Sequence, residues 1–138
     1  MDNKVKAIVF QPTKGKAVKV LLGRDDKDSL LKSIYSVMDV DMVEHVVICD
    51  GLEAYVDEEG LLKDKPTFGL VYTDVEGNIT RALAGNILFI NSDANGNTIS
   101  LTEKQIEKIA SLELYPLRYV DGRSNYAMVI KEEPRLVC

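Results

Sequence analysis

Three adjacent acids, Asp57, Glu58 and Glu59, form the cluster whose residue types could do chemistry most directly. Neighbouring carboxylates can hold a divalent cation, and a bound cation can activate water for the hydrolysis of a phosphoester. Gly60 follows them, however, and adjacent acids before a glycine are typical of a solvated turn. A cation-dependent hydrolase is therefore an alternative function, and the acids by themselves predict no enzyme.

The other residues with catalytic potential lack the partners that their chemistry needs. His45 is the only histidine, and no serine or cysteine lies in a recognisable nucleophile motif. Its place between Glu44 and Val46 is typical of a half-exposed strand residue. Residues 91–97 imitate the start of a calcium loop, but Thr102 occupies the twelfth position, where a bidentate glutamate belongs. The sequence therefore predicts no metal, no cofactor and no catalytic residue.

Basic and acidic residues are segregated along the chain, whose net charge is −5. The first 24 residues carry six basic residues against one acid, whereas residues 25–59 carry eleven acids against two lysines. Lysine and arginine are good donors for phosphate groups. We therefore predict an anionic-ligand site built from these basic residues: Lys14, Lys16, Lys19, Arg24 and Arg81.

Strand geometry limits how these residues can converge. Side chains alternate between the two faces of a strand, so Lys16 and Lys19 point to opposite faces. The lysines converge only at a bulge or beside a neighbouring subunit, which favours a site at a homo-oligomer interface. The acidic segment 25–59 allows another role, an acidic nucleic-acid mimic that occupies a host protein, although a net charge of −5 is modest for it. Direct nucleic-acid binding is not expected.

The elements that would position these residues follow from hydrophobic periodicity and turn residues. Helices are predicted at 28–38, with Asp28 as the capping residue, and at 102–112, where Thr102 and Gln105 have capping-box spacing. Strands are predicted at 4–10, 16–22, 43–49, 52–56, 70–73, 79–83, 87–90, 117–120 and 126–131. The pattern predicts a single α+β domain with a mainly antiparallel sheet and two principal helices packed on it.

The chain is organised around residues 70–90, which have the pattern of the middle of that sheet, with 87–90 buried on both faces. Residues 61–69 are expected to form a surface loop, because Pro66 is excluded from a central strand position. At 138 residues the chain fits one domain, predicted to span 1–131 and to be followed by a tail at 132–138.

Cysteine usage and hydropathy favour an intracellular setting. Cys49 lies in an apolar run and Cys138 at the last position, so both are expected to be unpaired and reduced. No basic and apolar leader follows Met1, and no run approaches the length of a membrane span. We expect a soluble, cytoplasmic protein with no membrane partner.

Residues 46–109 also carry a combination of landmarks. They are the Val-Val-Ile-Cys strand at 46–49, the acidic turn at 57–60 followed by Leu62, Pro66, the turn at 74–78, Ala84-Gly85 before the strand 87–90, and the helix start at 100–107. Together they resemble the family called domain of unknown function 3846, found largely in phages and mobile elements of Gram-positive bacteria. In that family an Asn-Arg pair follows the proline by two residues, whereas this chain has Phe68-Gly69. If that pair carries a shared activity, this chain lacks it.

The resemblance leaves residues 117–131 as a C-terminal hairpin extension peculiar to this protein. Small proteins of such elements often block host defences or bind host factors, so the resemblance implies a binding role in place of catalysis. We therefore expect an accessory protein of a phage or mobile element that is not an enzyme. Its expected partner is a host protein, or a small anionic ligand, such as a signalling nucleotide, that it sequesters.

Overall fold

The computed structural model describes residues 4–23, 27–40, 42–49, 51–60 and 65–131, without the side chains of Lys27 and Asp28. The predicted capping role of Asp28 therefore lies outside the described side chains. In chain order the described elements are β1 (Lys4–Gln11), β2 (Lys16–Gly23), α1 (Lys27–Met38), β3 (Val43–Cys49), β4 (Leu52–Asp57), β5 (Phe68–Thr73), β6 (Ile79–Ala84), β7 (Ile87–Ser92), β8 (Thr98–Ile99), α2 (Glu103–Ser111), β9 (Leu114–Arg118) and β10 (Ser124–Lys131).

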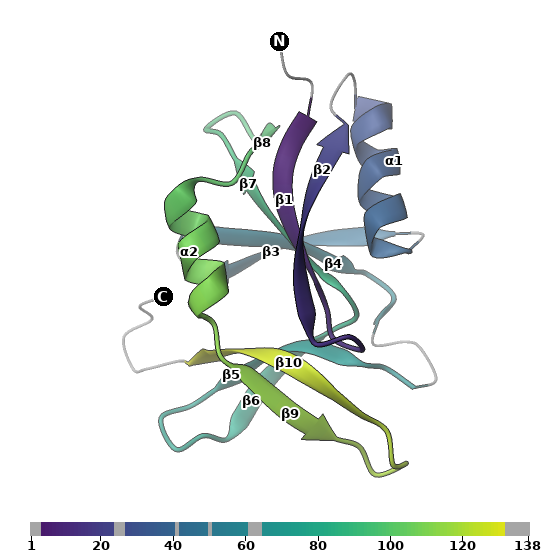
Figure 1. Ribbon diagram of the computed structural model, residues 1–138, viewed down its shortest axis with the longest axis vertical. Coiled ribbons are helices and arrows are strands. Elements are labelled where there is room, and N and C mark those ends of the chain that lie inside the picture. Colours follow the sequence, from purple (N-terminus) through teal and green to yellow (C-terminus); the bar gives the residue numbers. More distant parts are fainter. Residues whose placement is uncertain (1–3, 24–26, 41, 50, 61–64, 132–138) are drawn as a thin grey trace.

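The strands form two sheets (Figure 1). The large sheet has the strand order β2-β1-β7-β4-β3, with β8 paired to β7, and all its neighbours are antiparallel. The small sheet has the order β6-β5-β10-β9, in which β5 and β10 are parallel. The fold is richer in sheet than the α+β prediction suggested but compatible with it, and its pairing is mainly antiparallel.

The chain changes sheets at Gly85, within the segment 70–90. β5 and β6 form a hairpin of the small sheet, whereas β7 lies in the centre of the large sheet. The expectation that 70–90 is the middle of one sheet is therefore wrong. Gly85 has a φ of 83°, and Gly69 lies so close to the Gly85 carbonyl that no side chain fits, so two glycines permit the crossover. Strand alternation is the same on both sides of a crossover, which is why the sequence pattern did not indicate it.

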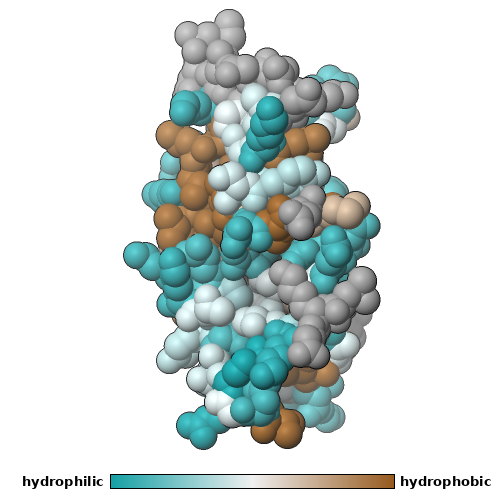
Figure 2. Space-filling model, turned by 90° about the vertical axis from the view of Figure 1, so that its right-hand side faces the viewer, coloured by the Kyte–Doolittle hydropathy of each residue, from teal (hydrophilic) through white to brown (hydrophobic). Residues whose placement is uncertain are grey.

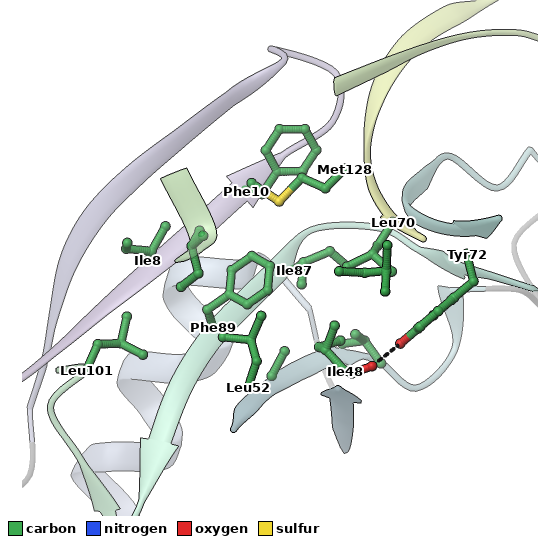
Figure 3. Packing of buried hydrophobic residues seen from close by; sticks show 14 residues of the cluster. Ile8, Phe10, Ile48, Leu52, Leu70, Tyr72, Ile87, Phe89, Leu101 and Met128 are labelled. Carbon is green, nitrogen blue, oxygen red and sulfur yellow. Dashed lines mark hydrogen bonds between the residues drawn. The ribbon is translucent and has the colours of Figure 1, made fainter. Parts of the chain in front are cut away.

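The large sheet is covered on both faces. On one face α1 packs Ile34 against Leu88 and Ile90 of β7. On the other face α2 and the small sheet surround Phe89, in the cluster drawn in Figure 3. All four residues 87–90 are buried, so the predicted burial of this strand on both faces is confirmed.

The two sheets also share hydrogen bonds and a core. The Tyr72 hydroxyl donates to the Ile48 carbonyl at 3.0 Å, which links β5 to β3 (Figure 3). Met128 and Ile130 of β10 join the same hydrophobic cluster. The small sheet is therefore packed onto the large one through buried residues on several strands.

The C-terminal hairpin contributes to this core. β9 and β10 pair antiparallel as predicted, although β9 begins at Leu114, before the predicted start, and contains Pro116. The proline is tolerated because β9 is the outer strand of the small sheet. β10 lies between β5 and β9, so the hairpin is joined to the rest of the small sheet by the pairing of β10 with β5. The predicted tail at 132–138 lies outside the described residues.

Local predictions for the helices and the first hairpin are confirmed. α1 ends at Met38, and β1 and β2 pair over eight successive residues without a shift. Before α2, the Thr102 hydroxyl accepts the Gln105 N–H, and the Gln105 side chain accepts the Thr102 N–H. This is the predicted capping box, in which two backbone donors at the helix start are satisfied reciprocally.

Cys49, at the end of β3, is disulfide-bonded, so the expectation of a reduced thiol there is wrong. Cys138 lies outside the described residues. A disulfide requires two cysteines to be close in space, and their positions in the sequence do not give that distance, so the sequence did not indicate the disulfide. Neither of the two described helices is long and apolar enough to cross a membrane.

Candidate ligand-binding groove

A groove lies between the β1–β2 hairpin and the start of α2, and it encloses about 220 Å³. Its lining combines two lysines and one glutamate with apolar residues from both sides. We name it the basic groove, and its lining residues are Lys6, Ala7, Ile8, Lys19, Val20, Leu21, Leu101, Glu103 and Ile106. Figure 1 shows the elements that form its two sides, α2 on one side and the strands β1 and β2 on the other.

Strand register places the two lysines on one face of the hairpin. Lys6 pairs with Leu21 and Ile8 pairs with Lys19, so these residues form two adjacent rows on the same face. Residues of the other parity, such as Val5, pack under α1 on the opposite face. The two ammonium groups therefore extend from diagonal positions, with Ile8 and Leu21 between their stems.

Backbone hydrogen bonds hold the segment before α2 against β1. The Leu101 N–H donates to the Lys6 carbonyl at 3.0 Å, and the Lys6 N–H donates to Ser100 Oγ at 2.9 Å. Ile109 anchors α2 in the core, and Ile106, one turn earlier, lines the groove. The groove is therefore formed by elements whose positions are fixed by hydrogen bonds and by buried side chains.

The lining carries a net positive charge. Lys6 and Lys19 are exposed, and within the described residues neither ammonium makes a hydrogen bond or an ion pair. Glu103 is the only acid among the described lining residues. Ammonium groups attract an anion, and an apolar floor favours an apolar body attached to that anion. The lining thus offers charged donors beside an apolar surface.

The structure describes four of the five predicted basic residues and does not bring these four together. Lys19 lines the basic groove, but Lys14 lies in the β1–β2 turn and Lys16 points to the opposite face of β2, as alternation predicted. Arg81 lies on β6 of the small sheet, with its guanidinium carbon 4.9 Å from the centre of a tyrosine ring. Arg24 lies outside the described residues. Ligand binding by any of these residues stays a prediction.

Lys6 is the groove residue that the sequence prediction missed. It shares one face of β1 with Ile8 and Phe10, and the predicted hairpin turn fixes a register that places Lys6 diagonally from Lys19. That register could have indicated the pair. The wall formed by α2 could not have been found in this way, because Ser100 lies 94 residues from Lys6.

The three acids behind the hydrolase alternative differ in burial. Asp57 ends β4 and is 8% exposed, and one of its oxygens accepts the Glu59 N–H at 3.0 Å. Glu58 and Glu59 are exposed. A cavity of about 210 Å³ beside Asp57 also contains Asp39 and Lys65. Among the described residues, no group of three or more His, Cys, Asp and Glu could hold a metal ion.

The two other predicted motifs have ordinary structural roles. His45 Nε2 lies 2.7 Å from Glu53 Oε1, and the histidine side chain is 44% exposed, as predicted for a half-exposed strand residue. Asp93 Oδ1 accepts the N–H groups of Asn95 and Asn97, each at 2.9 Å. The carboxylate thus stabilises its own turn, which is the usual role of aspartate at this position.

Phe68 and Gly69 occupy the place where the resemblance implied an Asn-Arg pair, and here they have structural partners. The Phe68 N–H donates to the Tyr119 hydroxyl at 2.9 Å, and the two rings stack with their centroids 6.2 Å apart. The Asn125 amide donates to the Phe68 carbonyl at 2.9 Å. The β9–β10 hairpin therefore holds the start of β5.

Comparison with known proteins identifies one family. Residues 5–113 match the family described as Domain of unknown function (DUF3846). The match is longer than the resemblance at 46–109 and includes both sides of the basic groove. It ends before β10. No curated protein and no solved structure gives a significant match.

Proposed function

The chain belongs to the DUF3846 family, and we propose that it is a non-catalytic accessory protein of a phage or mobile element that sequesters a small anionic ligand. The proposed site is the basic groove. One observation carries the proposal: Lys6 and Lys19 extend from the same face above an apolar floor, without an ion-pair partner among the described residues.

A nucleotide combines the two features that such a groove can bind. Its phosphate accepts hydrogen bonds from ammonium groups, and its base offers a flat apolar surface to Ile8, Leu101 and Ile106. The volume of about 220 Å³ lies below the roughly 300–1,000 Å³ of most small-molecule sites. We therefore expect the groove to hold one base and one phosphate group, with the rest of a larger nucleotide outside it.

Isothermal titration calorimetry with a panel of linear and cyclic nucleotides tests this proposal. At least one nucleotide is expected to bind, and its affinity should fall as salt is added, because exposed charges are screened over about 8 Å at physiological ionic strength. Inorganic phosphate should bind more weakly than the nucleotide, because it leaves the apolar floor uncovered. Equal affinities for phosphate and nucleotide would show that the floor makes no contribution.

Charge reversal locates the site. Lys6→Glu and Lys19→Glu are each expected to weaken nucleotide binding at least about tenfold, because a hydrogen bond to a charged group contributes about 1.5–3 kcal/mol and about 1.4 kcal/mol is tenfold. Lys14→Glu and Lys16→Glu are matched controls, since they change the same charge on the same hairpin but outside the groove. These controls should stay within about threefold of the unmodified protein, since screening weakens charges outside the site.

Two results would contradict the proposal in different ways. Equal weakening by all four variants would indicate attraction by the overall charge of the hairpin and not by the groove. The absence of nucleotide binding by the unmodified protein would remove the small-ligand form and leave a host protein as the expected partner. The homo-oligomer predicted from the sequence is not required for this site, because Lys6 and Lys19 already share a face.

A further inference from the structure

β2 forms the most regular of the described sheet edges. β3 has a bulge between Val47 and Cys49, β9 contains Pro116, and the pairing of β6 with β5 shifts register twice. Bulges and prolines at an edge hinder the addition of a further strand. β2, by contrast, pairs with β1 over eight successive residues without a shift and contains no proline. Its outer side is therefore a suitable template for another strand.

The backbone groups of alternate β2 residues face this open side. In an antiparallel ladder, the N–H and C=O of one residue point to the same side, and those of the next residue point to the other side. The Gly23 N–H donates to Ser33 Oγ of α1 at 3.0 Å, so Gly23 faces away from β1. Ala17, Lys19 and Leu21 have the same parity. Within the described residues, their backbone groups make no hydrogen bond to another element.

The side chains beside this edge favour an acidic partner. Lys16 is exposed on one face of β2, and Lys19 and Lys6 are exposed on the other. Leu21 is 57% exposed. Figure 2, which views the molecule from the side of α1, shows apolar residues at the surface among hydrophilic ones in the upper half of the molecule. An added strand would thus meet ammonium groups on both faces and an apolar contact near one end.

We propose that β2 is a docking edge for an extended acidic segment of a partner protein, which adds to the large sheet as an antiparallel strand. Hydrogen bonds to the backbone of Ala17, Lys19 and Leu21 supply affinity, and the lysine side chains select acidic residues. Lysines on an edge discourage neutral or basic strands, but they leave the ladder groups of β2 uncovered. Two copies of the chain are unsuitable partners through β2, because antiparallel β2–β2 pairing would bring their lysines together.

Nuclear magnetic resonance of the labelled full chain tests the docking edge. The probe is the peptide acetyl-Glu-Val-Glu-Val-Glu-amide, and the largest shift changes are expected at the amides of Ala17, Lys19 and Leu21. The amides of Val18 and Val20 already bond to β1 and should change less. A peptide with lysine in place of glutamate should cause no such changes. If the acidic peptide does not bind, the proposal is wrong.

A backbone variant separates strand addition from simple attraction of charge. Ala17→Pro removes one outward N–H while keeping every N–H that bonds to β1, so it should weaken peptide binding at least tenfold and leave nucleotide binding unchanged. Ala17→Thr keeps the N–H and is the matched control. Methylating the peptide on the nitrogens of its valines, or of its glutamates, tests the same bonds with the unmodified protein. One of these two peptides should lose binding.

Three outcomes would overturn the docking edge. The first is equal binding of both methylated peptides, because strand addition uses alternate amides of the incoming segment. The second is full peptide binding by folded Ala17→Pro. The third is a dimer of the unmodified chain that Ala17→Pro converts to a monomer, which would assign β2 to contact between copies. Nucleotide binding uses the lysine side chains, so its failure would not remove the docking edge.

Discussion

Replacing Gly69 with alanine should destabilise the fold strongly, because this residue lies where the chain passes from one sheet to the other. A Cβ atom at position 69 would lie 2.3 Å from the Gly85 carbonyl oxygen and 3.1 Å from Ile87 Cγ1. Ordinary contacts begin near 3.4 Å, so the backbone would have to separate by about 1 Å. The variant therefore tests the close approach on which the crossover depends.

The magnitude follows from what holds the two segments together. The Gly85 N–H donates to the Thr67 carbonyl at 2.6 Å, so moving Gly85 away from Gly69 weakens this bond. Overpacking costs about 1–3 kcal/mol, and a lost backbone hydrogen bond costs about 0.5–1.5 kcal/mol more. Alanine recovers only about 0.4–1 kcal/mol by restricting the unfolded chain. Together these ranges span a loss of about 0.5–4 kcal/mol, so we expect the free energy of unfolding to fall by about 2 kcal/mol.

Urea denaturation followed by far-ultraviolet circular dichroism measures this loss. The matched control is Gly77→Ala, since Gly77 has a φ of 85° but no atom within 4 Å of the new Cβ. The control should lose less, because the cost of a left-handed alanine, about 1–2 kcal/mol, is offset by the same restriction of the unfolded chain, about 0.4–1 kcal/mol. If Gly69→Ala proves no more destabilising than Gly77→Ala, the two sheets do not approach each other as described, and our account of the crossover fails.

Two further predictions concern local interactions. Thr102→Ala should lower the free energy of unfolding by about 1 kcal/mol in urea denaturation, because it removes one half of the capping box, whereas Thr102→Ser should retain it. Side-chain and backbone hydrogen bonds from Arg123 lower the pKa of Asp121 from its ordinary value of 3.8. Arg123→Gln should therefore raise this pKa towards 3.8 in a magnetic-resonance titration. Because the pKa of Asp121 is lower in the folded protein, the interaction stabilises the fold fully at a pH above the ordinary pKa of 3.8. This stabilisation is lost as the pH falls through the folded pKa. An unchanged pKa in Arg123→Gln would show that the guanidinium does not act on this carboxylate.

Elements stabilised by neighbours in the sequence could be predicted from the sequence. The capping residues of α2 lie three positions apart, so the helix start is fixed by contacts within one turn. The β1–β2, β5–β6 and β9–β10 hairpins depend on turns of a few residues, and the positive φ of Gly15 and Gly77 supports the first two of these turns. The apolar run at 87–90 required a strand covered on both faces, because each side chain needs removal from water wherever the strand lies.

Only the tertiary structure decided how these elements combine. Period-two alternation tells which residues share a face, but it does not tell which sheet a strand joins, and so β6 and β7 could not be assigned to different sheets. The parallel pairing of β10 with β5 and the approach of α2 to Lys6 join residues far apart in the chain. Loop-closure entropy depends only weakly on such separations, so chain distance barely discriminates among alternative pairings. The basic groove exists because one such long-range contact, the docking of α2, places a helix opposite the hairpin face that carries Lys6 and Lys19.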